Sequence, residues 1–322
     1  MMKSKTRWGI LSTAAITEQL IPAIKSHKQS ELVAIASRNF SKAEETARQW
    51  KISRSYGSYQ ALLDDPEVDI VYIPLPNHLH LEWTLKAARA GKHVLVEKPI
   101  ALSVDEVDQM AAAARENHII IQEAFMYRFN PQTARVNQLM SEGVLGDLRF
   151  MRSGFQHIHN RTDDYRLKPE FGGGVLWDMG CYPVNFFQMI TGTSPISVTA
   201  HKQTGQTGID RSFFATMHFL KNVTSQFATS FDLPSYANVE LHGTEGILFV
   251  SSPFKQRGPT GIILKRGKGF QNFSFNTKDP YIAEVENMVQ TANGEAEVVI
   301  SLLDSRKTVS TIHMLHEAAE NA

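Results

Sequence analysis

The chain has 322 residues, of which 42% are apolar and 20% charged, so it is long enough for two domains with sizeable cores. Lys plus Arg and Asp plus Glu both number 33, and this zero formal charge argues against nucleic acid or an anionic membrane as a partner. The single cysteine, Cys181, excludes an internal disulfide and any multi-cysteine metal site.

The first 123 residues alternate strand-like apolar runs with helix-like segments. We predict strands at 8–11, 32–36, 70–73, 93–96 and 119–122, and helices at 15–25, 41–50, 59–63, 80–90 and 104–116. Pro22 is expected to bend or restart the first helix, and Ser41 to cap the second, with Glu44 three residues on. Gly91 is expected to end the fourth helix. This alternation predicts right-handed βαβ crossovers and a parallel sheet.

Residues 124–322 show a different pattern, in which most strands follow one another without intervening helices. We predict helices at 130–142, 175–191, 281–293 and 303–320, and strands at 148–157, 197–201, 213–219, 225–231, 237–242, 246–250, 261–265 and 270–275. This pattern is typical of an α+β domain with a large, mostly antiparallel open sheet. We therefore predict an α/β protein with one domain over residues 1–123 and a second over 124–322.

A turn of small residues follows the first predicted strand, as Gly9-Ile10-Leu11-Ser12-Thr13-Ala14. A Rossmann turn requires small residues here, because backbone amides and a helix N-terminus must approach a pyrophosphate. Ser12 stands where the fingerprint has its second glycine, so the pattern is incomplete and an ordinary turn remains an alternative. Its position at the start of a βαβ unit favours dinucleotide binding.

The second predicted strand ends in Ala36-Ser37-Arg38, without the Asp or Glu that NAD-specific folds place there. An arginine at this point can form forked hydrogen bonds with a 2′-phosphate and stack on adenine, and Ser37 can donate one more. A solvated surface Arg38 is the alternative. We expect NADP as the preferred cofactor, with NAD as the second candidate.

Five motifs then follow in chain order. They are Pro74-Leu75-Pro76-Asn77-His78-Leu79-His80, Gly91-Lys92-His93-Val94, Val96-Glu97-Lys98-Pro99, Glu123-Ala124-Phe125-Met126-Tyr127-Arg128, and Gly172-Gly173-Gly174 with Asp178-Met179-Gly180-Cys181-Tyr182-Pro183. Together they resemble the Gfo/Idh/MocA oxidoreductase family, and the resemblance spans essentially the whole chain. It implies a Rossmann NAD(P)-binding domain over 1–123 and a substrate-binding and oligomerisation domain over 124–322.

The resemblance also implies roles for single residues. Lys98 is expected to face substrate and nicotinamide, with Pro99 following in a cis peptide, and Glu97 to lie near the nicotinamide ribose. Asp178 is expected to position substrate hydroxyls. The expected cofactor-binding residues are Gly9, Leu11, Ser12, Thr13, Ala14, Ser37, Arg38, Pro74, Leu75, Asn77, His78, Glu97 and Lys98.

Tyr182 stands where many family members have a histidine. A tyrosine there is similar to the branch with glucose–fructose oxidoreductase, dimeric dihydrodiol dehydrogenase and NADP-dependent D-xylose dehydrogenase. Asp178 and Tyr182 lie four residues apart on a predicted helix and therefore share a face. An unperturbed tyrosine has a pKa of ~10, which a neighbouring ammonium lowers. We hypothesise that Tyr182 is the general acid/base, Lys98 its electrostatic partner and Asp178 an acceptor for substrate hydroxyls.

The remaining polar candidates have two interpretations each. Tyr127 and Arg128 either line the substrate cleft or hold the two domains together. His157, with His159 and Arg161 nearby in sequence, either contacts substrate or has a structural role. No metal site is expected, because neither close histidine pair has a third ligand nearby.

These residues predict an NADP-dependent dehydrogenase or reductase acting on CH–OH groups (EC 1.1.1.- or 1.3.1.-) of a small sugar, polyol or diol. The alternative is a non-catalytic regulatory protein that senses a sugar or nucleotide on the same fold. An enzyme is favoured because a sensor has no need of an acid/base pair. The identity of the substrate and the reaction direction stay open.

Assembly and location are predicted from hydrophobic patterning. Phe213, Phe219, Phe227 and Phe231 alternate on predicted strands and are expected to form an exposed apolar patch, so we expect a homodimer or homotetramer through the C-terminal sheet. Residues 1–8 lack the apolar core of a signal peptide, and no apolar run approaches the ~20 residues that cross a bilayer. A cytoplasmic location is the expectation.

Overall fold

The computed structural model describes residues 5–255, 259–276 and 279–321, and the chain divides into two compact units. The first unit comprises Met1–Met126 and Tyr281–Leu302, and the second comprises Tyr127–Pro280 and Leu303–Ala322. The sequence interpretation placed one boundary after residue 123, whereas the structure returns a late segment of the chain to the first unit. Within the described ranges, no helix is long and apolar enough to cross a membrane.

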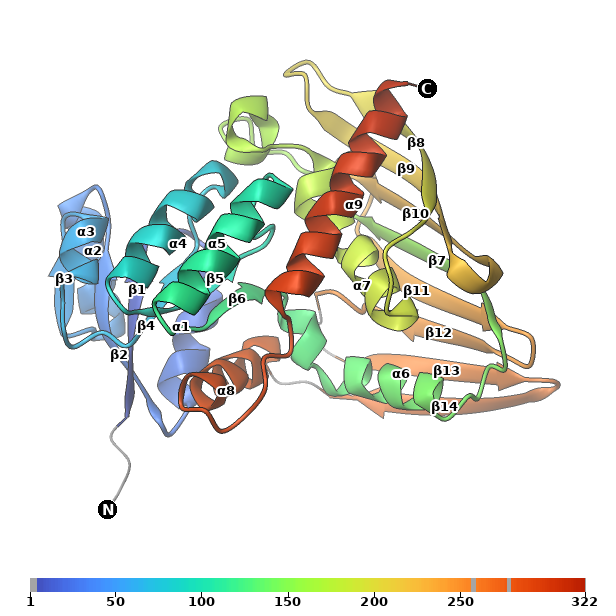
Figure 1. The fold of residues 1–322 in the computed structure, drawn as a ribbon, viewed down its shortest axis with the longest axis horizontal. Helices are drawn as coiled ribbons and strands as arrows, with labels where there is room; N and C mark the ends of the chain where they lie inside the picture. Colours follow the sequence, from blue (N-terminus) through green and yellow to red (C-terminus); the bar gives the residue numbers. More distant parts are fainter. Residues whose placement is uncertain (1–4, 256–258, 277–278, 322) are drawn as a thin grey trace. The chain divides into compact units, whose positions relative to one another are not determined.

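The first unit contains a six-stranded parallel sheet with the order β3-β2-β1-β4-β5-β6 (Figure 1). The strands are β1 (Thr6–Leu11), β2 (Ser30–Ala36), β3 (Arg54–Tyr56), β4 (Ile70–Ile73), β5 (His93–Glu97) and β6 (Ile121–Ala124). The order reverses between β1 and β4, which is the switch point of a doubly wound Rossmann sheet. The predicted α/β class is confirmed. The strand β3 was not predicted, because three half-buried residues show no apolar run.

Helices alternate with these strands along the chain. They are α1 (Thr17–Ser26), α2 (Phe40–Trp50), α3 (Tyr59–Leu63), α4 (His80–Arg89) and α5 (Val104–Glu116), joined by α8 (Pro280–Ala292) from the late segment. Gly91 adopts φ 70° after α4, as predicted. The predicted cap of α2 was wrong: Asn39 Oδ1, and not Ser41, accepts a hydrogen bond from the Lys42 backbone N–H at 3.3 Å.

Pro22 lies inside α1 and does not divide it. A proline in a helix removes one backbone hydrogen bond and bends the axis. The residues on both sides of Pro22, Leu20, Ile21, Ala23 and Ile24, are all buried, so tertiary packing holds the segment in a single helix.

The second unit contains an eight-stranded sheet with the order β14-β13-β12-β11-β7-β10-β9-β8 (Figure 1). The strands are β7 (Leu148–Gln156), β8 (Ser197–Thr204), β9 (Asp210–Phe219), β10 (Val223–Ser230), β11 (Tyr236–Gly243), β12 (Ile247–Ser251), β13 (Thr260–Arg266) and β14 (Gly269–Phe275). β7 and β10 pair in parallel, and the other neighbouring strands pair antiparallel. The predicted mostly antiparallel sheet is confirmed.

Helices cover one face of this sheet. α6 (Pro131–Ser141) lies along β13, where the Gln132 side chain donates to the Ser251 and Gly261 carbonyls at 2.9 and 3.0 Å. The segment predicted as one helix over 175–191 begins with a π-helical turn, Leu176–Gly180, and continues as α7 (Cys181–Thr191). The last helix, α9 (Leu302–Glu320), crosses the same face (Figure 1).

The phenylalanines predicted to form an exposed patch, Phe213, Phe219, Phe227 and Phe231, are buried, so that prediction was wrong. They point to the helix-covered face, where the Phe213 ring stacks on Phe227 with centroids 6.4 Å apart. The same ring meets His316 of α9 at 6.0 Å. Alternation identified residues that share a face, but it could not tell which face the helices cover.

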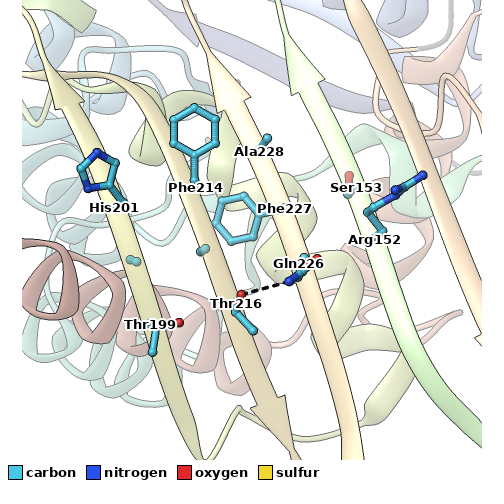
Figure 2. Close-up of a pocket in the computed structure, with 11 residues that line it drawn as sticks. Arg152, Ser153, Thr199, His201, Phe214, Thr216, Gln226, Phe227 and Ala228 are labelled. Atoms are coloured by element: carbon cyan, nitrogen blue, oxygen red, sulfur yellow. Dashed lines mark hydrogen bonds between the residues drawn. The ribbon is translucent and has the colours of Figure 1, made fainter. Parts of the chain in front are cut away.

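The opposite face of the eight-stranded sheet carries the residues that alternate with these phenylalanines along the strands. A hollow of about 490 Å³ lies over β7, β8, β9 and β10. Thr199, Phe214 and Arg152 are among the residues that line it (Figure 2). Gln226 donates a hydrogen bond to Thr216 Oγ1 across two of these strands at 3.4 Å. Phe214 is 37% exposed among mainly polar neighbours, so this face is mixed in polarity and not a continuous apolar patch.

Candidate functional site

The residues predicted to bind the cofactor lie around the carboxyl edge of the parallel sheet. Leu11 ends β1, Ser37 and Arg38 follow β2, and Pro74, Leu75, Asn77 and His78 follow β4. Glu97 ends β5, and Lys98 comes directly after it. Ligands of doubly wound sheets bind at this edge, near the switch point. The fold therefore gathers these residues at the edge where that class of ligand binds.

Gly9 is placed differently, inside β1, where it pairs with Ala34 and Val71. A Cβ atom at Gly9 would lie 2.7 Å from Leu62 Cδ2 and 3.0 Å from Val68 Cγ1. Glycine at this position therefore lets α3 approach the strand closely. The structure gives Gly9 a packing role, two residues before the strand ends.

The turn after β1 has the geometry of a glycine-containing turn. Ser12 adopts φ 145°, a conformation that residues with a Cβ atom rarely adopt. Its Oγ accepts a hydrogen bond from the Ala14 N–H at 3.0 Å. Thr17 then donates to the Ala14 carbonyl through its N–H at 2.9 Å and its hydroxyl at 2.7 Å, which starts α1. The serine is thus accommodated without loss of the turn.

Tyr59, the first residue of α3, is a neighbour of this turn that the sequence analysis did not single out. Burial raises the pKa of the Tyr59 hydroxyl. The Arg38 guanidinium and the Ser12 hydroxyl lower this pKa, but by less than burial raises it. Ser12, Arg38 and Tyr59 form what we call the Arg38 cluster, at the ends of β1 and β2. No sequence pattern marked Tyr59, because its place depends on how α3 packs against the sheet.

The end of β5 presents a carboxylate and a lysine. The Tyr72 hydroxyl donates a 2.6 Å hydrogen bond to Glu97 Oε1, and the Lys98 backbone N–H donates to Oε2 at 3.3 Å. Burial, followed by the Glu97 charge, holds the pKa of Tyr72 well above its ordinary value, so Tyr72 remains a donor. Lys98 is 9% exposed, and the Lys98–Pro99 peptide is cis, as expected.

His80 links the two loops that carry these groups. Its ring lies 2.8 Å from the Pro99 carbonyl through Nδ1 and 2.7 Å from the Leu75 carbonyl through Nε2. Burial lowers the pKa of His80 to about 4, although both carbonyls favour its charged form. The sequence motif contained His80, but the functional expectation rested on His78. In the structure His80 ties the loop after β4 to the loop after β5.

In the second unit, Asp178 lies in the π-helical turn and Tyr182 one turn later, at the start of α7. A π turn contains more residues than an α turn, so positions four apart stay close to one face. Asp178 is 7% and Tyr182 1% exposed. The Tyr182 ring lies 5.2 Å from Phe155 and 5.5 Å from Phe254, centroid to centroid. These rings fix its position.

Asp178 and His157 line one cavity of about 380 Å³ in the second unit. Its wall also contains Ile158, His159, Asn160, Arg161, Asp164, Arg166 and Lys255. Burial, followed by the nearby Lys255 charge, lowers the pKa of His157, which favours the neutral ring. The wall is therefore polar and carries charges of both signs. We call this the Asp178 cavity. The sequence analysis did not identify Asp164, Arg166 or Lys255.

Arg166 pairs with both carboxylates of this cavity. Its Nε lies 3.1 Å from Asp178 Oδ1, and its Nη1 lies 3.0 and 3.1 Å from the two oxygens of Asp164. Burial lowers the pKa of Arg166, but the charges of Asp178, Tyr165 and Asp164 outweigh it and leave the pKa raised.

Tyr127 and Arg128 converge on Asn185 of α7. The Tyr127 hydroxyl and Arg128 Nη1 donate to Asn185 Oδ1 at 2.6 and 3.2 Å. Asn185 Nδ2 in turn donates to Thr308 Oγ1 of α9 at 3.1 Å. Within the second unit these residues connect α7 to α9. Among the described residues, no three His, Cys, Asp or Glu side chains are arranged to hold a metal ion.

Comparisons with known proteins agree with these features. Residues 6–125 match an oxidoreductase family with an NAD-binding Rossmann fold, and residues 133–249 match the GFO/IDH/MocA C-terminal domain. The chain belongs to the Gfo/Idh/MocA oxidoreductase family.

Relatives in this family match the chain over nearly its full length. The chain is 32% identical to a D-xylose 1-dehydrogenase (NADP(+)) of Haloferax volcanii, with 97% of both chains covered. It is 31% identical to a trans-1,2-dihydrobenzene-1,2-diol dehydrogenase of Xenopus tropicalis, with 95% of both covered. A 3-ketoreductase of Actinomadura kijaniata, solved with NADP and TDP-benzene, superposes with a TM-score of 0.92 at 27% identity, with 98% of both covered.

The family binds NAD(P), and the residues of the first unit fit that cofactor. The turn at Ser12 keeps a backbone conformation typical of glycine, the residue that the dinucleotide fingerprint has at this position. No side chain caps the N-terminus of α1, and such an end favours anions. Arg38 supplies a cation beside the same turn. The chain is thus an NAD(P)-binding Gfo/Idh/MocA oxidoreductase.

Proposed function

We propose that the protein is an NADP-dependent dehydrogenase or reductase that acts on a hydroxyl-bearing carbon of a small sugar, polyol or diol. The observation that carries this proposal is the Asp178 cavity, in which a buried carboxylate lies among polar side chains. Such a wall suits a ligand with several hydroxyl groups, because each buried polar group needs a hydrogen-bond partner. The relatives named for D-xylose and for a trans-diol support the same substrate class.

Each catalytic candidate has a proposed role. Tyr182 is the general acid/base for the hydroxyl proton, and Lys98 stabilises its phenolate. Asp178 accepts hydrogen bonds from substrate hydroxyls. The pairing of Lys98 with Tyr182 comes from the resemblance of the motifs around them. Bound nicotinamide would accept or supply the hydride.

The cofactor preference for NADP rests on the Arg38 cluster. Arg38 follows β2, where NAD-specific folds carry an acidic residue. Arg38 is exposed, but its guanidinium interacts with the Tyr59 hydroxyl, which favours an oriented side chain. The remaining expected contacts, from Thr13, Asn77, His78 and Glu97, belong to the same proposal. The A. kijaniata structure, solved with NADP, supports it.

Substrate contacts beyond Asp178 are proposed for His157, which lines the cavity. Tyr127 and Arg128 are weaker candidates, because both donate to Asn185. A homodimer or homotetramer through the eight-stranded sheet stays part of the proposal, with the mixed face of Figure 2 in place of the predicted phenylalanine patch. Light scattering tests this assembly, and a monomer would contradict it.

The second candidate function is a regulatory protein that binds a sugar or nucleotide without turning it over. One experiment separates the two functions. Nicotinamide absorbance is followed with NADP⁺ and NAD⁺ over a panel of aldoses, inositols and trans-diols, for the wild type and for Tyr182→Phe. Turnover that Tyr182→Phe abolishes, while NADPH still binds, supports the enzyme. Tight NADPH binding with no turnover of any substrate supports the sensor.

A further inference from the structure

The carboxylate of Asp178 is held by a second residue of its own cavity, Arg166. Arg166 Nε lies 3.1 Å from Asp178 Oδ1, and the Asp178 side chain is 9% exposed. An opposite charge at this distance stabilises an ionised carboxylate, and the effect increases where water is largely excluded. The pair therefore favours the negative form of Asp178 and fixes the direction of one of its oxygens.

Arg166 is itself fixed at its other end. Its Nη1 contacts both oxygens of Asp164, whose side chain is 6% exposed. Asp164 Oδ1 also accepts the Arg166 backbone N–H at 3.0 Å. The guanidinium lies over the Tyr165 ring, with Cζ 4.6 Å from the centroid. A side chain restrained by two carboxylates and a ring keeps one orientation, so it can orient its partner.

Two of the three glycines in the motif, Gly173 and Gly174, explain how Arg166 reaches Asp178. The Gly174 N–H donates to the Arg166 carbonyl at 2.8 Å. A Cβ atom at Gly173 would lie 2.5 Å from that carbonyl oxygen, and one at Gly174 would lie 2.1 Å from Asp210 Oδ1. Only glycine permits both approaches. The turn thus joins the segment that carries Arg166 to the π-helical turn that carries Asp178.

We propose that Arg166 is a positioning residue, which holds Asp178 ionised and aimed at the substrate through their ion pair. This inference rests on the proposed function, in which Asp178 accepts substrate hydroxyls. Other titratable or charged groups line the same cavity as this carboxylate: His157, His159, Arg161, Asp164 and Lys255. The pKa values of both histidines are lowered, mainly by burial, which favours their neutral rings, whereas Arg166 is a permanent cation in direct contact with Asp178.

The test compares Arg166→Met and Arg166→Lys with the wild type in the pH dependence of kcat/KM. Methionine keeps much of the side-chain bulk but removes the charge. In the pH profile of Arg166→Met, the acid limb of kcat/KM is expected to move to higher pH by about one unit. The value of kcat/KM itself is expected to fall by roughly 100-fold. Lysine restores the positive charge but lacks the planar set of donors of the guanidinium group. In Arg166→Lys the acid limb of the profile should therefore return towards the wild-type position, while kcat stays reduced.

Arg149→Met is the matched control. Arg149 pairs with an exposed carboxylate, Asp147, at 2.9 Å, outside the Asp178 cavity. This variant should keep the wild-type pH profile. Circular dichroism and the thermal midpoint of each variant separate loss of the ion pair from loss of the fold. An acid limb that stays in place in a folded Arg166→Met protein would overturn the inference.

A second readout does not depend on turnover. The ¹³Cγ signals of labelled aspartates are followed against pH, and the Asp178 signal is assigned by its loss in Asp178→Asn. Its titration midpoint should move to higher pH in Arg166→Met, and an unchanged midpoint would contradict the proposal. If the wild type turns over none of the panel, the proposed function fails, but this titration still decides whether Arg166 controls the charge of Asp178.

Discussion

Asp210 Oδ2 accepts the backbone N–H of Leu176 at 2.7 Å, at the first residue of the π-helical turn. Burial raises the pKa of Asp210 to about 7, although the backbone donors around it favour the charged form. The carboxyl group that anchors this turn therefore titrates near neutral pH, and its partner Leu176 lies two residues before Asp178 in the same turn.

This relationship predicts a pH dependence of stability. The folded-state pKa of Asp210 is raised above its ordinary value of 3.8. The stabilisation of the folded state that comes from this raised pKa is therefore fully present below about pH 4. It is lost as the pH rises to about 7, and it amounts to on the order of 4 kcal/mol in total. Asp210→Asn should remove this fall in the free energy of unfolding, measured by urea denaturation from pH 4 to 8. Asp147→Asn, at an exposed position, should keep the wild-type slope.

His80 predicts the opposite slope. Burial lowers its pKa from 6.5 to about 4, with the Lys98 charge acting in the same direction. The stabilisation of the folded state that comes from this lowered pKa is present above about pH 6.5. It is lost as the pH falls towards 4, and it amounts to on the order of 3 kcal/mol. The neutral ring donates through one nitrogen only, and His80→Gln keeps one such N–H donor without this titration. The free energy of unfolding of the wild type should fall relative to His80→Gln between pH 6.5 and 4.

The two variants check one another. Asp210→Asn and His80→Gln should change the pH slope of stability with opposite signs, so a general effect of weakened packing cannot reproduce both results. His201→Gln, on the uncovered sheet face, is the control for the histidine variant. Parallel curves for wild type and His80→Gln would contradict the assignment of His80.

The sequence predicted most helices and strands because caps and apolar patterns are formed by residues that are close together in the chain. The helix at Val104–Glu116 and the strand at Ile70–Ile73 have the predicted bounds, since Ser103 caps the helix directly before its first residue and the strand is a continuous apolar run. The pairing of Arg166 with Asp178 had no such signal, because it depends on how the glycine turn folds back. For the same reason the side of the sheet to which Phe213 points could not be predicted: it depends on the position of α9.

Ser12 predicts a difference between two substitutions. Ser12→Ala and Ser12→Gly both remove the hydroxyl that accepts from Ala14, but only alanine keeps a Cβ atom at φ 145°. Such backbone strain is worth on the order of 1–3 kcal/mol. The glycine variant should therefore be the more stable of the two, by about 1 kcal/mol after its larger unfolded-state entropy is counted. Chemical denaturation of both variants measures the difference.

The matched control for Ser12 is Ser197, the first residue of β8. The backbone there does not adopt positive φ, so glycine should be less stable than alanine at this position. The same order of stability at both positions would show that Ser12 is not strained in the folded protein.

Arg38 predicts the cofactor preference. A charged hydrogen bond to a phosphate is worth about 1.5–3 kcal/mol, which corresponds to roughly 10- to 100-fold in affinity. Arg38→Asp should therefore weaken NADPH binding by about this factor and improve NADH binding, because aspartate accepts from ribose hydroxyls and repels a 2′-phosphate. Quenching of protein fluorescence measures both dissociation constants without a substrate.

The control is Arg48→Asp. Arg48 is an exposed residue of α2, so this substitution makes the same change of charge away from the Arg38 cluster and should leave the ratio of the two dissociation constants unchanged. If both substitutions weaken NADPH binding equally, the preference arises from the general charge of this surface and not from contact between Arg38 and the 2′-phosphate.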